Sequence, residues 1–395
     1  MRKITLLFII FQVNFTLAQW SPQTLPEPMG LFLDLYTFDS NNIIAVGQFV
    51  KAYKTTNGGS TWVNYGPSGS ADWFTNVDFI DQNIGCAVTL NGSIFRTTNG
   101  GTSWTQTGTG FNPIYSIDFI NATTGYAVGI GNLLKTTNAG VTWNYVATVS
   151  SEPMNQVTFF NASIGFIVGN GGAIYKTTNG GVNWTAQTST TTSSLTSIFF
   201  ADQNTGWAIG PGGLILKTTN GGTTWTTQTS NTTLELLGVY AINTTTAYVV
   251  GESGKILYTT NGGTTWTSQV SGTNNNLLEV KFTDSATGYI VGQSGTILKT
   301  TNGGLSVDEI STTNYKSTIS PNPFKNSFTV KIENGLTLSN AILTISTLLG
   351  STVKVVKELN GSEFFLDGLQ LNSGVYLYSI TENEKLITSG KIIAE

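Results

Sequence analysis

The chain has 395 residues and a formal net charge of −4, and only 10% of its residues are charged, against about a quarter in an average soluble protein. It contains no His and a single Cys, Cys86. These absences exclude a triad with an imidazole base, a His-ligated zinc site and a disulfide framework, and we expect no metal and no cofactor. The 45 Gly residues and the 11% of aromatic residues favour short strands and tight turns over helices.

Residues 1–18 have the pattern of a secretory signal peptide. Arg2 and Lys3 precede an apolar run that is too short to span a bilayer, and Ala18 is a small residue at the expected cleavage point. The alternative is a buried N-terminal strand. No later stretch has the roughly 18 continuous apolar residues of a membrane helix. The sequence therefore predicts an exported protein without a transmembrane helix.

A phrase close to Lys-Thr-Thr-Asn-Gly-Gly-x-Thr-Trp recurs, beginning at residues 54, 96, 135, 176, 217, 258 and 299. A period this constant is typical of a stacked unit of about four strands. The Asn-Gly pair can adopt the positive φ that a tight hairpin requires. The Trp at the end of the phrase has a large apolar area and an N–H donor for packing against the turn and the adjacent unit. These structural Trp residues are Trp62, Trp104, Trp143, Trp184, Trp225 and Trp266.

One unit is predicted to contain strands at 116–120, 126–128 and 133–136, and a fourth strand that begins at Trp143. The seventh phrase stops at Gly304, whereas Trp20 precedes Trp62 by one repeat length and has no unit of its own. If the segment at Trp20 supplies the missing fourth strand of the last unit, the ring closes and no sheet edge remains exposed. We therefore predict an all-β fold in which residues 19–306 form a seven-bladed β-propeller.

The turn phrases resemble the Asp-box, or bacterial neuraminidase, repeat, with Asn where Asp often stands. The repeat length, together with Gly-Tyr-Ala-Val-Gly strands such as residues 125–129, most closely resembles the seven-bladed propellers of the photosystem II stability/assembly factor family. The resemblance covers about residues 20–306 and implies the propeller fold. It implies little about function, because such repeats recur in many secreted proteins.

The proteins that contain this type of repeat include sialidases, whose carboxylate-binding site needs a cluster of Arg side chains. Residues 20–306 contain one Arg, Arg96, in the position where the other repeats mostly have Lys, so a sialidase is excluded. Nucleic-acid binding is also disfavoured. Acidic residues outnumber basic ones over this range, and most of the basic residues are spaced regularly along the repeat and do not cluster.

A carboxylate pair is the remaining catalytic candidate. Asp78 and Asp118 occupy the same position of the first strand in adjacent units, and first strands line the central channel of a propeller. Such a pair could perform the acid–base work of a glycosidase or hold a hard cation. The alternative, which we favour, is that each carboxylate caps local backbone amides or pairs with Lys281.

The loops that join the fourth strand of one unit to the first strand of the next are the least repetitive segments. Exposed aromatic side chains there could stack on sugar rings or anchor a protein partner. The alternative is that they only cap the apolar top of their own blades. The predicted ligand-binding residues in and beside these loops are Trp73, Phe74, Phe111, Tyr115, Glu152 and Glu235.

The repeat ends before a polar linker at 307–318, and residues 319–395 are predicted to form a small β-sandwich because apolar and polar residues alternate there, as at 328–332. The motifs Pro-Asn-Pro-Phe at 321–324, Gly-Val-Tyr at 374–376 and Gly-Lys-Ile-Ile at 390–393, in this order, closely resemble the type A sorting domain of the type IX secretion system. That resemblance implies delivery across the outer membrane of Bacteroidota, with release or surface attachment. The alternative is an immunoglobulin-like adhesion module. The sorting-signal residues are Pro321, Asn322, Pro323, Gly374, Tyr376, Gly390 and Lys391.

Together these patterns predict an exported, non-catalytic propeller that acts as a binding or scaffold protein on the cell surface or in the medium. Its expected partners are the sorting machinery and an unidentified protein or glycan ligand. The alternatives are a glycan-active hydrolase that uses Asp78 and Asp118, and a chaperone that resembles the assembly factors of a membrane complex.

Overall fold

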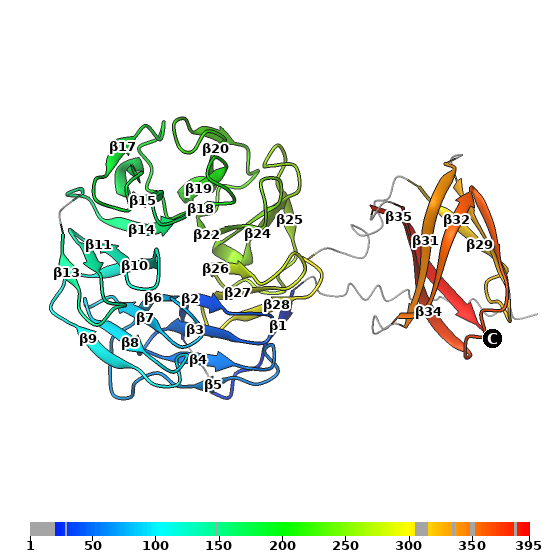
Figure 1. Ribbon diagram of the computed structural model, residues 1–395, viewed down its shortest axis with the longest axis horizontal. Coiled ribbons are helices and arrows are strands. Elements are labelled where there is room, and N and C mark those ends of the chain that lie inside the picture. The colour runs from blue at the N-terminus through cyan, green and yellow to red at the C-terminus, as the bar shows by residue number, and fades with distance from the viewer. Residues whose placement is uncertain are drawn as a thin grey trace, which may run out of the picture. The chain divides into compact units, whose positions relative to one another are not determined.

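The computed structural model describes residues 20–27, 30–146, 149–304, 315–333, 336–347, 352–382 and 385–395. The described residues form two compact units, one within Ala18–Gly304 and the other within Leu305–Glu395 (Figure 1). The predicted signal peptide and its cleavage point at Ala18 lie outside the described residues. No helix among the described residues is long and apolar enough to cross a membrane.

The first unit is a ring of seven four-stranded antiparallel sheets, which confirms the predicted seven-bladed propeller (Figure 1). Blades 1 to 3 consist of β2 (Phe32–Thr37), β3 (Ile43–Gly47), β4 (Ala52–Thr55) and β5 (Val63–Asn64); β6 (Phe74–Phe79), β7 (Gly85–Thr89), β8 (Ile94–Thr97) and β9 (Thr105–Gly108); and β10 (Ile114–Phe119), β11 (Gly125–Gly129), β12 (Leu133–Thr136) and β13 (Asn144–Tyr145).

Blades 4 to 6 consist of β14 (Met154–Phe159), β15 (Gly165–Gly169), β16 (Ile174–Thr177) and β17 (Thr185–Gln187); β18 (Ser197–Phe200), β19 (Gly206–Gly210), β20 (Leu214–Thr218) and β21 (Thr226–Gln228); and β22 (Leu236–Ala241), β23 (Ala247–Gly251), β24 (Ile256–Thr259) and β25 (Thr267–Gln269). Three short 3₁₀ helices join the second and third strands of these blades: η1 (Asn170–Gly172), η2 (Pro211–Gly213) and η3 (Glu252–Gly254). Blade 7 consists of β26 (Leu277–Phe282), β27 (Gly288–Gly292), β28 (Ile297–Thr300) and β1 (Ser21–Pro22).

The second strand of every blade is buried along its whole length, as in β11, because adjacent blades cover both faces of each sheet. This burial explains the uninterrupted apolar sequence of these strands. The Gly at the end of such a strand is required by close approach of the backbone, since a Cβ on Gly129 would lie 2.0 Å from the Pro113 carbonyl oxygen. Similar distances, of 2.0 to 2.4 Å to a backbone carbonyl oxygen, recur at Gly47, Gly169, Gly210, Gly251 and Gly292.

The repeated turn is organised by the hydroxyl of a buried Thr. In blade 2, Thr97 Oγ1 donates to Asn99 Oδ1 at 3.0 Å and accepts the backbone N–H of Gly101 at 2.9 Å. Asn99 Oδ1 also accepts the backbone N–H of Ser103. Gly100 and Gly101 both have positive φ, as the Asn-Gly-Gly pattern predicts. The turn phrase is therefore a hydrogen-bonded folding device.

The Trp residues of the phrase fill the spaces between blades, but the predicted use of their N–H groups holds only in part. Trp104 Nε1 donates to the Gly101 carbonyl oxygen and Trp266 Nε1 donates to Gln228 Oε1. The N–H groups of four others are buried without a hydrogen-bond partner among the described residues: Trp62, Trp143, Trp184 and Trp225. Apolar packing therefore accounts for most of what these side chains do.

In five of the seven phrases, the cation at the first position joins one blade to the next. Lys176 Nζ donates to the Gly221 carbonyl oxygen at 2.6 Å and lies 5.6 Å from the centre of the Phe166 ring. Equivalent bonds to a turn carbonyl of the following blade are made by Lys54, Arg96, Lys217 and Lys299. The regular spacing of these cations therefore serves the assembly of the ring.

The N-terminal strand completes the last blade, as predicted. Ser21 pairs with Lys299 and Pro22 pairs with Leu298, so β1 is the outer strand of blade 7 (Figure 1). Trp20 is fully buried, packs edge-on against Phe282 and donates its indole N–H to Gln269 Oε1 at 2.8 Å. The ring is also closed on the other side of blade 7, because Lys299 Nζ donates to the Gly58 carbonyl oxygen of blade 1.

The second unit is a two-sheet β-sandwich, which fits the predicted class. One sheet has the order β29-β30-β33 and the other has the order β32-β31-β34-β35. Their buried side chains form one core that includes Phe324, Phe328 and Ile392. The strands are β29 (Ser317–Ser320), β30 (Phe328–Ile332), β31 (Leu338–Thr347), β32 (Thr352–Gly361), β33 (Glu363–Leu366), β34 (Gly374–Glu382) and β35 (Lys385–Ala394).

The sandwich brings the two ends of the sorting motif together. Asn322 Nδ2 donates to the Lys391 carbonyl oxygen, and Asn322 Oδ1 accepts the backbone N–H of Ile393. Gly390 leaves room for the ring of Tyr378, whose nearest atoms would lie 2.8 Å from an added Cβ. The linker prediction at 307–318 extends too far, since Ser317 and Thr318 pair with β30. Its Ser- and Thr-rich sequence lacks the apolar alternation that identifies a strand.

Candidate functional site

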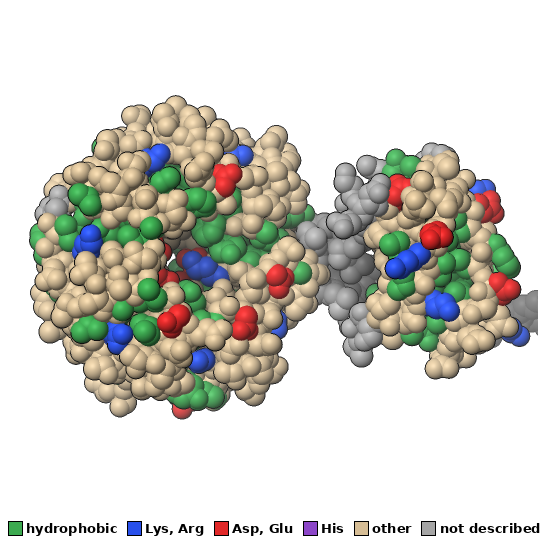
Figure 2. Space-filling view, in the orientation of Figure 1, with side chains coloured by type: hydrophobic (Ala, Val, Ile, Leu, Met, Phe, Trp, Pro, Cys, Tyr) green, Lys and Arg blue, Asp and Glu red, His purple; other side chains and the backbone are tan. Residues whose placement is uncertain are grey.

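The first strands of the seven blades surround a central channel, which Figure 2 shows as a hollow containing acidic and basic side chains. Residues at equivalent register positions form three rings along this channel. The mouth ring is Leu33, Thr75, Tyr115, Asn155, Thr196, Leu237 and Leu278. The middle ring is Asp34, Asn76, Ser116, Gln156, Ser197, Gly238 and Glu279. The far ring is Tyr36, Asp78, Asp118, Thr158, Phe199, Tyr240 and Lys281.

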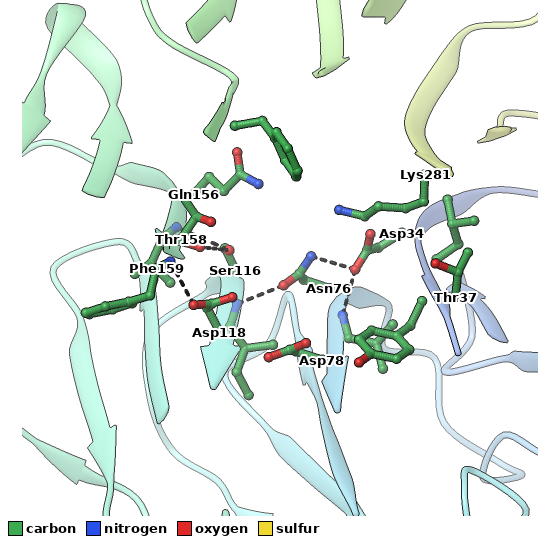
Figure 3. A pocket seen from close by; sticks show the side chains of 16 residues that line it. Asp34, Thr37, Asn76, Asp78, Ser116, Asp118, Gln156, Thr158, Phe159 and Lys281 are labelled. Atoms are coloured by element: carbon green, nitrogen blue, oxygen red, sulfur yellow. Dashed lines mark hydrogen bonds between the residues drawn. The ribbon is translucent and has the colours of Figure 1, made fainter. Parts of the chain in front are cut away.

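Two cavities occupy the channel. The larger, of about 300 Å³, is lined mainly by the middle and far rings, and the smaller, of about 120 Å³, by the mouth and middle rings. Both cavities are lined by Asn76, Ser116 and Gln156. The larger cavity therefore lies toward the carboxyl ends of the first strands, where the charged side chains of the far ring are found (Figure 3).

Most side chains of the middle ring bond to the backbone of the next blade. Asp34 Oδ2 accepts the N–H of Val77 at 2.9 Å, and the same pattern continues around the ring. The side-chain oxygens of Asn76, Ser116 and Gln156 likewise accept backbone N–H groups of the next blade. The donors are Ile117, Val157 and Ile198, respectively. The pattern stops at Ser197, whose Oγ is buried without a hydrogen-bond partner among the described residues. The next position is Gly238, where a Cβ would lie 2.7 Å from the carbonyl oxygen of Leu278.

Asp78 and Asp118 line the same cavity (Figure 3), and each also bonds to the following blade. Asp78 Oδ2 accepts the backbone N–H of Phe119 at 2.6 Å, and Asp118 Oδ2 accepts that of Phe159 at 2.8 Å. The structure thus brings the predicted pair together. It also gives both carboxylates the role of capping backbone amides, with donors that belong to the next blade.

Burial changes the protonation of these carboxyl groups. It raises the pKa of Asp34 to about 7, against the opposing attraction of Lys281, and it raises the pKa of Asp78 to about 7 as well. Burial and then the negative charge of Asp78 raise the pKa of Asp118 well above its usual range. Asp34 and Asp78 therefore change protonation state near neutral pH.

Lys281 is the cation of the far ring. Its Nζ lies 3.5 Å from Glu279 Oε1, and its side chain remains 25% exposed, against 11% for Glu279. Burial alone would lower the pKa of Lys281, but Glu279 and Asp34 outweigh this effect and raise it. Lys281 therefore stays charged at neutral pH.

The six predicted ligand-binding residues do not form one cluster. Phe74 was wrongly placed on the surface: it is fully buried and packs against Phe95 and Trp104, with ring centroids 5.4 and 5.8 Å away. It points inward because it begins β6, where the first strand enters the blade core. Tyr115 belongs to the mouth ring of the channel.

The other four lie on the connecting-loop face, which we define as the rim formed by the segments from each fourth strand to the next first strand. Phe111 is half-buried against the core of blades 2 and 3, and Trp73 is half-buried with its carbonyl oxygen bonded to the N–H of Leu90. Glu152 is exposed, and the backbone N–H of Glu235 donates to Glu252 Oε2. These four residues are spread over several blades.

Asp34 and Glu279 are channel acids that the sequence analysis did not identify. Each lies two residues before a far-ring position, Tyr36 and Lys281 respectively, so the alternation of a strand with one face on the channel was the available signal. Within the described residues, no group of three or more Cys, Asp or Glu side chains is arranged to hold a metal ion.

Comparison with known proteins agrees with this architecture. Residues 69–198 and 189–271 match the model of the photosynthesis system II assembly factor YCF48 family. Residues 318–395 match the model of the secretion system C-terminal sorting domain. A search of curated proteins finds no match.

Similar solved structures include YCF48 bound to a D1 peptide, which is 22% identical with a TM-score of 0.63 and aligns over 72% of this chain and 97% of its own. YCF48 from Cyanidioschyzon merolae is 20% identical with a TM-score of 0.62, over 72% and 99% of the two chains. The GH74 xyloglucanase from Xanthomonas campestris is 11% identical with a TM-score of 0.61, over 80% of this chain and 60% of its own. These structural likenesses show the fold. Because the two matches to its model together span more than half of the residues, the chain belongs to the photosynthesis system II assembly factor YCF48 family, and it ends in a secretion-system sorting domain.

Proposed function

We propose that this protein is an exported, non-catalytic binding module that presents its propeller to a polypeptide partner at the cell surface or in the medium. The sorting domain at 318–395 supports secretion or surface attachment through the type IX system and implies contact with the secretion machinery. The propeller supports a scaffold or assembly-factor fold. The released or anchored final state and the cleaved signal peptide are parts of this proposal.

The observation that carries the non-catalytic part is the use of the channel carboxylates. In both Asp78 and Asp118, one carboxylate oxygen accepts a hydrogen bond from a backbone N–H of the next blade. A glycosidase needs one carboxyl group that is protonated and one that is held ionised. Here burial raises the pKa of both groups, so neither is held ionised by its surroundings.

The connecting-loop face is the proposed partner surface, because its segments differ most among otherwise similar blades. A solved structure of similar fold is described as YCF48 bound to a D1 peptide, and this likeness supports a polypeptide as the class of partner. Trp73 and Phe111 supply apolar area on this face, and Glu152 and Glu235 supply charge. Aromatic side chains are enriched in protein-binding surfaces, whose rims are polar.

Site-specific photo-crosslinking on intact cells tests this surface. The full chain would carry a benzoylphenylalanine at position 73 or 152 on the connecting-loop face, and at Thr102 in the repeated turn at the opposite ends of the strands as the matched control. We expect a discrete polypeptide adduct from positions 73 and 152 and none from position 102. Adducts from position 102 alone, or from no position while the protein is present outside the cell, would contradict the proposal.

A glycan-active hydrolase is the second candidate, because a xyloglucanase shares the fold and Asp78 and Asp118 line one cavity. Incubating the secreted protein with xyloglucan and measuring reducing ends tests it. We expect no release above that of the Asp78→Asn, Asp118→Asn double variant. Release by the native protein that the double variant lacks would replace our proposal with the hydrolase.

A chaperone that resembles an assembly factor is the third candidate, and the family match favours it. It predicts that the protein co-purifies with a membrane complex only while that complex is being assembled. If the protein co-purified equally with the finished complex, this result would instead support a permanent scaffold.

A further inference from the structure

The larger channel cavity has an excess of negative charge that its own cation does not balance. Four acidic groups, Asp34, Asp78, Asp118 and Glu279, and one basic group, Lys281, belong to the middle and far rings, and all except Glu279 line this cavity. Lys281 is nearest to Glu279, with 3.5 Å between Nζ and Oε1. The three Asp residues therefore have no cationic partner at ion-pair distance among the described residues.

Asp34 is the acid with an unused oxygen. Its side chain is 2% exposed and lines the larger cavity (Figure 3). Oδ2 accepts two hydrogen bonds, from Val77 N and Asn76 Nδ2, whereas Oδ1 is buried without a hydrogen-bond partner among the described residues. A buried carboxylate oxygen without a hydrogen-bond donor destabilises the folded state, so Asp34 Oδ1 favours binding of a ligand that donates a hydrogen bond to it.

The other residues that line the larger cavity determine which kind of hydrogen-bond donor it can bind. Asp78 and Asp118 contribute further carboxylate oxygens, and Asn76, Gln156 and Thr158 contribute neutral polar groups. Tyr36 and Phe199 add aromatic surface, which suits the methylene groups next to a cation. The described acids are not grouped as a metal requires. The cavity volume of about 300 Å³ suits a small organic group.

We propose that this cavity binds a primary alkylammonium group, with Asp34 Oδ1 accepting one of its N–H donors and with Asp78 and Asp118 adding negative charge to the lining. The group has two possible sources, a free alkyl diamine and the side chain of a Lys residue in a partner polypeptide. The site differs from the connecting-loop face, so it stands whether or not that face binds a partner.

Protons compete with the ammonium group for the same carboxylates. The titratable groups that face the cavity or adjoin it are Asp34 and Tyr36 on β2, Asp78 on β6, Asp118 on β10, Tyr240 on β22, and Glu279 and Lys281 on β26. The side chains of β14 and β18 at these positions are uncharged. Because burial raises the pKa of Asp34 and Asp78 to about 7, binding near pH 6 must displace protons. The apparent affinity therefore increases from pH 6 to pH 8.

Titration calorimetry of the full chain tests the site, with 1,5-diaminopentane as the free amine and acetyl-Gly-Lys-Gly-amide as the polypeptide source. The same peptide with an acetylated Lys side chain is the neutral control. Binding of both probes, or of only one, identifies the source, and each case supports the shared chemistry. The absence of binding to either probe at millimolar concentration, with the protein folded, would show that the cavity holds only water.

Two variants with opposite effects separate recognition from a structural role. Asp34→Asn retains an acceptor for Val77 but removes the charge, and we expect affinity to fall at least about tenfold. Lys281→Gln removes the competing internal cation, and we expect affinity to rise. Glu152→Gln, an exposed acid outside the channel, is the matched control and leaves affinity unchanged. Equal affinity of the Asp34→Asn variant and the native protein would overturn the proposal, and so would weaker binding by Lys281→Gln.

Discussion

Individual Asp residues in the propeller have opposite effects on the pH dependence of stability. Asp78 is buried, and its raised pKa of about 7 means that the folded state holds the proton more tightly than the unfolded chain, whose value is 3.8. Asp81 is an exposed turn residue, and hydrogen bonds from the backbone N–H groups of Ile84 and Asn83 lower its pKa. Protonation therefore stabilises the fold at Asp78 and destabilises it at Asp81.

The variant Asp78→Asn tests this at the residue scale. The contribution of Asp78 to stability is full below about pH 4 and is lost as the pH rises through 7, a change on the order of 4 kcal/mol. The free energy of unfolding of the native protein, measured by urea titration, should therefore fall between pH 5 and pH 8 more steeply than that of the variant. Asp81→Asn should follow the native slope over this range. Parallel curves for the native protein and Asp78→Asn would contradict the raised pKa.

Sequence reasoning located the far-ring carboxylates but not their bonding partners. The common position of Asp78 and Asp118 follows from the repeat, because equivalent residues in identical units face the same channel. Their donors, Phe119 N and Phe159 N, are backbone groups of another blade, and no pattern of side chains encodes them. Phe74 was misplaced for a related reason, since the end of a variable loop and the start of a buried strand look alike in sequence.

At the scale of the element, the blades resemble one another because the same contacts join each one to the next. Repeat spacing predicted β12 to the residue and the other strands of that blade to within two residues. In the sandwich, β29 and β33 were not predicted, because β29 is polar and β33 is short. Periodicity identifies a strand only when apolar and polar residues alternate over several residues, so that one face is apolar.

The cation between blades provides the test at this scale. Lys176→Met removes a 2.6 Å bond to the Gly221 carbonyl oxygen and a contact with the Phe166 ring, and we expect a loss of about 1–2 kcal/mol in the free energy of unfolding. Lys255 is the matched control, since its Nζ lies on an exposed surface, 3.5 Å from Ser268 Oγ. Lys255→Met should cost less than about 0.5 kcal/mol. Equal losses would show that the bond between blades adds nothing.

At the scale of the whole molecule, stability depends on closure of the ring through Trp20. Trp20→Ala removes a fully buried side chain, an edge contact with Phe282 and the bond to Gln269, and we expect a loss of about 3–5 kcal/mol by chemical denaturation. Trp104→Ala, which truncates a half-buried Trp of a blade that is continuous in sequence, should cost less. A smaller effect at Trp20 than at Trp104 would mean that blade 7 does not limit the stability of the ring.

The shared last blade also sets the order in which the protein can become folded. Ser21 bonds to the Lys299 carbonyl oxygen across 278 positions of sequence, so the first residues to emerge from a ribosome or a translocation pore must wait for nearly the last ones of the propeller. Contacts of such long sequence separation form slowly. Until they form, β28 offers a free edge to any neighbouring strand. This topology is thus compatible with crossing a membrane as an unfolded chain. Before β1 pairs with β28, however, the free edge of β28 can cause aggregation.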